Sequence, residues 1–252
     1  MDPDLERAAD LLRPAERIAV LTGAGISTES GIQDFRGPNG LWTKNPAAEK
    51  MATLQHYVGD PEVRKESWRN RVSSNYFEAE PNAGHRAVVD LERNGKLIAV
   101  ITQNVDGLHL DAGSSPALVH ELHGTVHRVK CLSCGEEAPM EKALARVRAG
   151  EEDPPCRTCG GILKSATISF GQNLEPDVVE RAERAALACD LMLVLGSTLG
   201  VYPAAGLVPV AVRSGADLVI VNEQPTAYDD VAEVVLRERI GTILPALVAT
   251  LS

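Results

Sequence analysis

Four cysteines, arranged as two pairs with the same internal spacing, form the clearest metal-binding pattern in this sequence. Cys131 and Cys134 form one C-x2-C pair, Cys156 and Cys159 form a second, and 21 residues separate the two pairs. Two pairs of this kind place four thiolates tetrahedrally around Zn²⁺ and leave no open coordination position. The pattern therefore predicts a structural zinc site rather than a catalytic one. The alternatives are unligated thiols or two disulfides, and a cytosolic chain seldom keeps structural disulfides.

A group of polar side chains follows an apolar stretch that has the composition of a buried strand. Gln103, Asn104 and Asp106 lie in the stretch TQNVDGLH, which begins at Thr102. Burying such groups is costly unless each finds a partner, and an Asn and an Asp together match the one acceptor and two donors of an amide. The stretch predicts a polar pocket for an amide. The alternative is a turn in which Asp106 caps a short helix.

His123 is the strongest candidate for a general base among the six histidines. It precedes a glycine in the stretch LHG, at the end of a short strand-like run, and an imidazole there can take up a proton near neutral pH. We expect His120 and His127 to be structural strand residues and His85 to lie at the start of a helix. We expect Cys189, the fifth cysteine, to be a buried apolar residue.

A glycine-rich stretch, GAGISTESGIQDFRG, begins at Gly23 after an apolar run. The dinucleotide fingerprint G-x-G-x-x-G needs a third glycine where this chain has Thr28. It also needs an acidic residue about 20 residues later, where this chain is aperiodic. A nicotinamide-dependent dehydrogenase is therefore disfavoured. The loop can still bring backbone N–H groups to a phosphate, with Arg36 as a charged donor and Phe35 as a cover for a flat ring. The alternative is a tight turn without a ligand.

Two further strand-like runs end in residues that suit a nucleotide. In LGSTLG, Gly196 and Ser197 lie before a helix, where backbone and hydroxyl groups can contact an anion or a ribose. In VIVNE, Asn222 and Glu223 end the next run, and a carboxylate there can hold ribose hydroxyls. Both runs predict ligand contacts at strand ends.

Apolar runs alternate with helix-like segments along most of the chain. This alternation predicts a doubly wound, Rossmann-like parallel sheet covered on both faces, with ligands at the carboxyl ends of its strands. Two stretches break the alternation: residues 38–60 have the character of a long loop, and residues 127–165 that of an inserted module with a short helix. We expect strands over 18–22, 96–102, 118–122, 191–196 and 216–222, and helices over 5–12, 61–77, 82–95, 203–215 and 242–251.

Composition and charge narrow the class of protein. The 252 residues are 44% hydrophobic and carry a formal charge of −10. An acidic chain is a poor ligand for nucleic-acid phosphates and suits a basic peptide better. No apolar run is long enough to cross a membrane, and the acidic N-terminal segment lacks the features of a signal peptide. We therefore expect a cytoplasmic protein that binds neither membrane nor nucleic acid.

Taken together, these motifs resemble the sirtuin family of NAD-dependent protein deacylases, in its bacterial form. GAGIS, DFRG, TQNVDGLH, LHG, the two cysteine pairs, GST and VN occur in the family's order and span nearly the whole chain. The resemblance implies NAD as co-substrate, one structural Zn²⁺, and acyl-lysine proteins or peptides as substrates. It also implies a Rossmann-like NAD-binding domain formed by residues 1–37, 81–126 and 166–252, a cofactor loop and helical module over 38–80, and a zinc module over 127–165.

The resemblance implies roles for single residues. His123 would deprotonate a ribose hydroxyl of NAD, and Asn104 would act with it from the nicotinamide pocket. Ser169, Phe170 and Gly171 in the stretch SFGQNL would pair with the substrate peptide. The implied NAD contacts are Gly23, Ala24, Thr28, Phe35, Arg36, Gln103, Asn104, Asp106, Gly196, Ser197, Asn222, Glu223 and Ile240, and the implied zinc ligands are Cys131, Cys134, Cys156 and Cys159.

The chain departs from the family at positions that bear on specificity. Many relatives have proline where this chain has Gln33, and loss of proline frees the backbone and adds an N–H, so we expect a change in loop mobility. Relatives selective for acidic acyl groups carry Tyr-x-x-Arg, which the stretch beginning at Trp68 matches only at Arg71. The resemblance therefore implies removal of acetyl or longer apolar acyl groups, deacetylation above all.

Three other activities use parts of the same pattern. Transfer of ADP-ribose from NAD to protein needs the same nicotinamide pocket and is the main alternative. A zinc-bearing dehydrogenase requires the acidic residue that this chain lacks after its second strand. A third alternative, an NAD-binding module without catalysis, assigns no role to His123 or to the polar stretch TQNVD.

Overall fold

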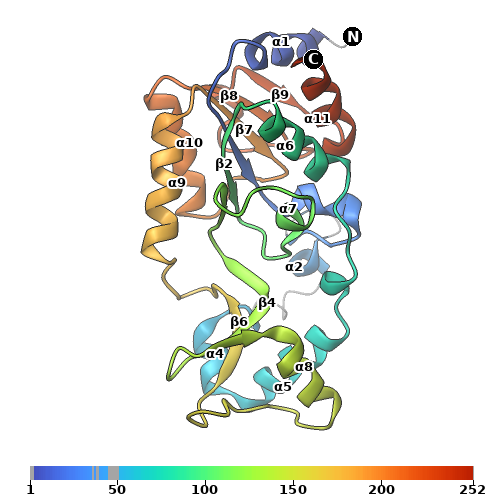
Figure 1. The fold of residues 1–252 in the computed structure, drawn as a ribbon, viewed down its shortest axis with the longest axis vertical. Coiled ribbons are helices and arrows are strands. Elements are labelled where there is room, and N and C mark those ends of the chain that lie inside the picture. Colours follow the sequence, from blue (N-terminus) through green and yellow to red (C-terminus); the bar gives the residue numbers. More distant parts are fainter. Residues whose placement is uncertain (1–2, 36, 38–39, 45–50, 252) are drawn as a thin grey trace.

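The computed structural model describes residues 3–35, 37, 40–44 and 51–251 (Figure 1). Two parts lie one above the other in Figure 1: a large part that contains both ends of the chain, and a smaller part built from the middle of the sequence. No helix in the described part of the chain is long and apolar enough to cross a membrane.

A six-stranded parallel sheet forms the centre of the large part. Its strand order is β3-β2-β1-β7-β8-β9, and every neighbouring pair runs parallel. The chain proceeds from β1 outward to one side and later resumes with β7 on the other side of β1, so a crevice opens between the loops that leave these two strands. The strands are β1 (Ile18–Thr22), β2 (Leu97–Thr102), β3 (Val119–Glu121), β7 (Leu191–Leu195), β8 (Asp217–Val221) and β9 (Val234–Leu236).

Helices cover both faces of this sheet and bury its central strands completely. Ile18 and Val20 of β1 pack in one apolar core, and Ala19 and Leu21 pack in the other. Burial on both faces explains why these strands are continuous apolar runs rather than alternating ones. The first core includes α1 (Pro3–Leu12), α6 (Ala83–Arg93) and α11 (Ile240–Val248), and the second includes α9 (Pro176–Ala188) and α10 (Leu207–Arg213).

The smaller part combines a three-stranded antiparallel sheet with α-helices, of which three lie within the described residues. Its strand order is β5-β4-β6, and Trp68, 1% exposed, packs against Met140 and Leu144 in its core. Segments far apart in the sequence thus form one module. Its elements are α4 (Leu54–Gly59), α5 (Pro61–Val72), β4 (Gly124–Cys131), β5 (Glu137–Pro139), α8 (Met140–Arg148) and β6 (Leu163–Thr167).

The helix expected over residues 61–77 is shorter than predicted. It begins with Pro61 in its first turn, ends at Val72, and is followed by a 3₁₀ turn over Asn75–Phe77. Two serines account for the early end, because the hydroxyls of Ser73 and Ser74 donate to carbonyls of the last helical turn. Such local side-chain bonds compete with continuation of a helix.

Other differences concern short or irregular elements. The described part of residues 38–60, expected to be a loop, contains α2 (Leu41–Lys44) and α4. The sequence patterns did not identify α9 or β9, and three residues are too few for β9 to display a period. The small sheet spans residues 124–167, slightly more than the inserted module expected over 127–165.

Candidate active site

One cleft of about 1410 Å³ lies where the carboxyl ends of β1, β2, β7 and β8 meet the smaller part. The structure brings together in this cleft every site residue that the sequence singled out, apart from the cysteines and Arg36, which lies outside the described residues. These lining residues are Gly23, Ala24, Thr28, Phe35, Gln103, Asn104, Asp106, His123, Ser169, Phe170, Gly171, Gly196, Ser197, Asn222, Glu223 and Ile240.

Three glycines let two strand-end loops pack directly on each other. The N–H of Gly23 donates to the carbonyl of Leu195 (3.0 Å), and the N–H of Gly25 donates to the carbonyl of Gly196 (2.9 Å). A Cβ added to Gly25 would lie 2.6 Å from the Cα of Gly196, so no larger residue fits there. The glycines thus join β1 to β7, and the chain continues into a 3₁₀ helix over Ala24–Ser30.

Ser27 holds Asn104 and Asp106 from behind. The Ser27 hydroxyl donates to Oδ2 of Asp106 (2.7 Å) and accepts from Nδ2 of Asn104 (3.1 Å). That Nδ2 also donates to the carbonyl of Gly23 (3.1 Å). The side chains of all three polar residues are buried. Because each is bonded to the protein, the pair is held in one geometry before any ligand enters.

Asp106 has two functions in this arrangement. Its Oδ1 accepts the N–H of Leu108 (3.0 Å) at the start of α7 (Leu108–Asp111), and it also lines the cleft. Burial raises the pKa of Asp106, and its bonds to Leu108 and Ser27 oppose that shift. Asp106 therefore bonds to the turn and also lines the cleft, and the pocket for an amide stays a prediction.

His123 is half-buried in the wall of the cleft. Its Nδ1 lies 2.9 Å from the carbonyl oxygen of Gln103, and in the neutral ring this contact requires the proton on Nδ1, which leaves Nε2 as the free base. Burial lowers the pKa of His123, and the Gln103 carbonyl partly offsets this. The imidazole is thus oriented as a neutral acceptor of protons.

The nucleotide-binding candidates join three strand ends. Nε2 of Gln103 donates to the hydroxyl of Ser197 (2.9 Å), which links the loop after β2 to the loop after β7. Nδ2 of Asn222 donates to the carbonyl of Gln224 (2.7 Å), and its Oδ1 is the group left for a ligand. Arg239, which the sequence analysis did not single out, lines the same end of the cleft beside Ile240.

The segment expected to bind peptide is paired along one side. Phe170 donates its N–H to the carbonyl of Ala52 (2.8 Å) and accepts the N–H of Leu54 (3.0 Å). Oε1 of Gln172 accepts the N–H of Ser169 (3.3 Å). The side chain of Phe170 is 38% exposed, so this edge of the cleft presents an apolar ring near its entrance.

The end of the cleft at the smaller part contains two cations that the sequence did not place together. Arg71 of α5 and Lys164 of β6 both line the cleft, and Nζ of Lys164 donates to two main-chain carbonyls. Burial, with a contribution from Arg71, lowers the pKa of Lys164 to about 7, and burial also lowers the pKa of Arg71. In the described part of the chain no carboxylate pairs with either, and Tyr57 and Tyr76 are the ionisable groups that act on Arg71.

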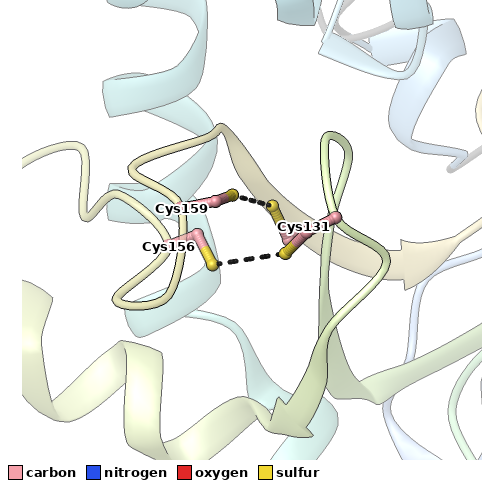
Figure 2. Close-up of side chains that lie close together, drawn as sticks. Cys131, Cys156 and Cys159 are labelled. Carbon is pink, nitrogen blue, oxygen red and sulfur yellow. Dashed lines mark hydrogen bonds between the residues drawn. The ribbon is translucent and has the colours of Figure 1, made fainter.

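The four paired cysteines converge at the tip of the smaller part. Figure 2 shows the two cysteine-bearing loops facing each other. The thiols of Cys131 and Cys159 are 3.5 Å apart, and those of Cys134 and Cys156 are 3.8 Å apart. All four sulfur atoms lie within 4.8 Å of one another, and none is in a disulfide. A tetrahedron with Zn–S bonds of about 2.3 Å has edges of roughly 3.8 Å. The cluster therefore fits a structural zinc ion, as the spacing predicts.

The sequence of the chain matches a known family over most of its length. The model of the Sir2 family matches residues 23–203. A protein of Streptomyces coelicolor named NAD-dependent protein deacetylase 2 is 55% identical over 230 residues, which cover 91% of this chain and 95% of that protein.

Solved structures agree with the sequence match. A Sir2 variant with a deacetylated p53 peptide and 3′-O-acetyl ADP-ribose superposes with a TM-score of 0.90 at 35% identity, and 97% of each chain is covered. A Sir2–p53 peptide–NAD⁺ complex gives a TM-score of 0.86 at 36% identity over 95% of each chain. From its fold, its motifs and these matches, the chain belongs to the Sir2 family.

Proposed function

We propose that the protein is an NAD-dependent protein-lysine deacylase, with deacetylation as its main activity. The observation that carries the proposal is the convergence of His123, as an oriented neutral base, with the bonded pair Asn104 and Asp106 in one cleft. The Streptomyces relative named an NAD-dependent protein deacetylase supports it. Proteins or peptides with an acylated lysine are the proposed substrates, and the cytoplasm is the proposed compartment.

The large part supplies the proposed NAD site. Asn104 and Asp106 bind the NH2 group of the nicotinamide carboxamide, because both Nδ2 hydrogens of Asn104 are already bonded and the pair offers oxygen acceptors. Gln103 contacts the ribose on that side. Adenosine lies at the other end of the crevice, where the proposed contacts are Gly196, Ser197, Asn222, Glu223 and Ile240. The proposed contacts of the first loop are Gly23, Ala24, Thr28, Phe35 and Arg36.

Acyl transfer then follows from positioning and one proton acceptor. The amide oxygen of the acyl-lysine bonds to C1′ of the ribose as the bond to nicotinamide breaks, and the bonding electron pair leaves with nicotinamide. Nε2 of His123 takes the proton of a ribose hydroxyl, whose oxygen bonds to the acyl carbon. The bond from the acyl carbon to the lysine nitrogen breaks as that nitrogen takes up a proton, water adds to the acyl carbon, and the bond from this carbon to the oxygen on C1′ breaks. The products are lysine, nicotinamide and O-acyl-ADP-ribose. Holding these groups in line supplies much of the rate, because an amide oxygen is a weak nucleophile.

The smaller part closes the other side of the proposed site. We assign residues 1–37, 81–126 and 166–252 to the NAD-binding domain, 38–80 to a cofactor loop and helical module, and 127–165 to the zinc module. Ser169, Phe170 and Gly171 pair with the substrate peptide. Cys131, Cys134, Cys156 and Cys159 hold the zinc, which fixes the two loops that carry them.

Product analysis tests the proposal directly. The protein is incubated with NAD and an acetyl-lysine peptide, and the products are weighed by mass spectrometry. Deacylation yields O-acetyl-ADP-ribose together with free lysine. ADP-ribose transfer would add mass to the protein, and hydride transfer would yield NADH. Either of those results, without O-acetyl-ADP-ribose, would overturn the proposal.

A paired substitution tests the role of His123. We expect His123→Ala to lower deacetylation by at least about 100-fold, the usual contribution of a general base, while binding of NAD persists. The matched control is His56→Ala, because His56 is exposed and does not line the cleft. Full turnover in His123→Ala would refute the assignment.

One observation favours a second acyl preference. Arg71 and Lys164 place two cations at the end of the cleft, and neither is paired with a carboxylate in the part of the chain that the structure describes. A cation taken out of water is costly unless an anion meets it. An acyl group that ends in a carboxylate supplies that anion. Parallel assays with acetyl-lysine and succinyl-lysine peptides decide which acyl class the protein removes faster.

A further inference from the structure

Two buried histidines behind the proposed nicotinamide pocket carry complementary unpaired nitrogens. His85 is 0% exposed and His109 is 2% exposed. Their ring centroids are 5.0 Å apart, with the rings inclined at 65°. Nε2 of His85 and Nδ1 of His109 are buried and have no hydrogen-bond partner in the described part of the chain. Such atoms are rare, because an unmade buried hydrogen bond costs free energy.

The contacts of His109 fix the position of its proton. The Thr22 hydroxyl donates its only hydrogen to Oγ1 of Thr102 (2.8 Å). Its contact with Nε2 of His109 (3.1 Å) must therefore be one in which the hydroxyl oxygen accepts. His109 consequently carries its proton on Nε2, and Nδ1 offers a lone pair.

The contacts of His85 fix its proton in the same way. The N–H of Asn82 donates to Nδ1 of His85 (3.4 Å), as part of the capping box that begins α6. Nδ1 is therefore the unprotonated nitrogen, and the neutral ring carries its proton on Nε2. His85 thus has a donor without an acceptor, beside a neighbour that has an acceptor without a donor.

We propose that Nε2–H of His85 donates to Nδ1 of His109, directly or through one buried water, and completes a polar relay that positions Asn104. The relay runs from Asn82 through His85, His109 and Thr22 to Thr102. At the ring separation of 5.0 Å a small rotation of either ring makes the direct bond. A bridging water would gain the two polar partners that it needs.

The far end of the relay meets the cleft at Asn104. The Oγ1 of Thr102 accepts the main-chain N–H of Asn104 (3.0 Å), so the relay acts on the backbone while Ser27 acts on the side chain. Neither histidine lines the cleft, and both are positioning residues. Their role in nicotinamide binding rests on the proposed function.

The hydrogen bonds of the relay keep the same donors and acceptors across the physiological pH range. Burial lowers the pKa of His85 to about 4 and that of His109 to about 3. Arg86 adds to the effect on His85, and His85 adds to the effect on His109. Both rings therefore stay neutral near pH 7, and neither proton needs to move.

Nitrogen NMR of the histidine rings tests the relay without any assay of activity. In ¹⁵N-labelled protein we expect His85 and His109 to be protonated on Nε2, with no titration between pH 5 and pH 8. Variants His85→Gln and His109→Gln assign the two signals. A proton on Nδ1 of either ring, or titration of either ring near pH 6.5, overturns the proposal.

A substitution at Thr22 tests whether the relay reaches the pocket. Thr22→Val removes the hydroxyl without changing the shape of the side chain, and Thr22→Ser keeps the hydroxyl. We expect Thr22→Val to weaken product inhibition by nicotinamide about tenfold, the effect of one lost hydrogen bond, while the affinity for ADP-ribose and the KM for peptide stay the same. Thr22→Ser should restore nicotinamide inhibition to within about twofold.

Two results would count against this role. Equal nicotinamide inhibition in Thr22→Val and Thr22→Ser would show that the relay does not act on the pocket. A parallel loss of affinity for ADP-ribose in Thr22→Val would indicate general loosening of the sheet instead. If the protein has no deacylase activity, the proposed function fails, whereas the NMR result and direct titration with nicotinamide still decide the relay.

Discussion

The two ends of the cleft satisfy their polar groups in opposite ways. At the strand ends of the large sheet, Asn104 and Asp106 are bonded to Ser27 and to the backbone before any ligand arrives. At the smaller part, Lys164 is a buried cation and Arg71 a partly buried one, and neither has a carboxylate partner among the described residues. The first end is preorganised, and the second is incomplete without an anion.

This difference follows from how each end is built. The large-sheet end is formed by loops that leave adjacent parallel strands, whose backbones are locked by the ladder between β1, β2 and β7. The other end is formed by a helix and a strand from segments far apart in the sequence, joined by a small core and by the cysteine cluster. We therefore expect the end of the cleft at the large sheet to keep its structure and its ligand binding when the end at the smaller part is disrupted.

Removal of the metal should have the largest effect on activity, and it should affect the two ends of the cleft differently. We expect a strong chelator, or Cys131→Ser with Cys134→Ser, to abolish deacylation, because four-thiolate zinc sites hold small modules together. Binding of ADP-ribose, measured by calorimetry, should persist, because its proposed contacts lie on the large sheet. Loss of ADP-ribose binding together with deacylation would contradict the independence of the two ends of the cleft.

Removal of one charge from the preorganised end should have the next largest effect. We expect Asp106→Asn to lower the rate of nicotinamide release about 100-fold, because a fixed buried charge is lost while the shape of the side chain stays. The acceptor for the N–H of Leu108 is kept, whereas the hydrogen bond that Oδ2 accepts from Ser27 is lost, so the thermal midpoint should fall by only about 2–4 °C. Asp111→Asn, on the exposed side of α7, is the control and should match the parent protein.

Removal of a cation from the incomplete end should change selectivity more than activity. We expect Arg71→Met to lower kcat/KM for a succinyl-lysine peptide about tenfold, the typical value of a charge-assisted bond to an anion, and to leave the acetyl-lysine value nearly unchanged. Arg69→Met is the matched control, because Arg69 lies on the same helix with its side chain 54% exposed and paired with Glu66. An equal loss for both peptides would show that Arg71 is structural.

The smallest expected effect is a change in acyl selectivity with pH. Because the pKa of Lys164 is lowered to about 7, its ammonium is charged below that pH and neutral above it. The ratio of kcat/KM for succinyl-lysine to that for acetyl-lysine should fall a few-fold as the pH rises from 6 to 8.5, and the effect of His123 titration cancels in this ratio. Lys164→Met should remove the pH dependence of the ratio, and a ratio that stays constant in the parent protein would contradict the role of Lys164.

The same lowered pKa has a consequence for folding stability. Lys164 has an ordinary value of 10.5 when the chain is unfolded, so between about pH 7 and 10.5 the unfolded state binds more protons than the folded state. Stability should therefore rise with pH across this window as far as Lys164 contributes. The difference between the parent protein and Lys164→Met isolates that contribution.

Predictions from the sequence were most accurate where spacing or period leaves few choices. The strand at 18–22 matches β1 residue for residue, because a strand buried on both faces is a continuous apolar run. The cysteine pairs converge as predicted, because a C-x2-C spacing brings two thiols together without help from the rest of the fold. The helix over 61–77 was predicted too long, because the serines that end it resemble ordinary polar surface residues.

Single residues in the glycine loop show the limit of motif reasoning. The sequence predicted that backbone N–H groups of this loop approach a phosphate, yet those of Gly23 and Gly25 bond to the carbonyls of Leu195 and Gly196. No local pattern indicates that the partner of this loop would be another strand end, 170 residues further along the chain. The missing third glycine has a structural reason, since the loop turns into a 3₁₀ helix and packs on β7.

By itself the sequence determined the cysteine pairs and the apolar strands of the sheet, and it supplied the candidates for the chemistry, because each of these patterns depends on neighbours within a few positions. Only the tertiary structure decided which of them share a cleft, that Ser27 binds both Asn104 and Asp106, and that Arg71 and Lys164 lie together without an anion. It also supplied the contacts from which we infer the proton positions of His85 and His109, because a tautomer depends on the partner of each ring nitrogen. The partner of His85 is the nearby Asn82, whereas Thr22, the partner of His109, belongs to a distant strand of the parallel sheet.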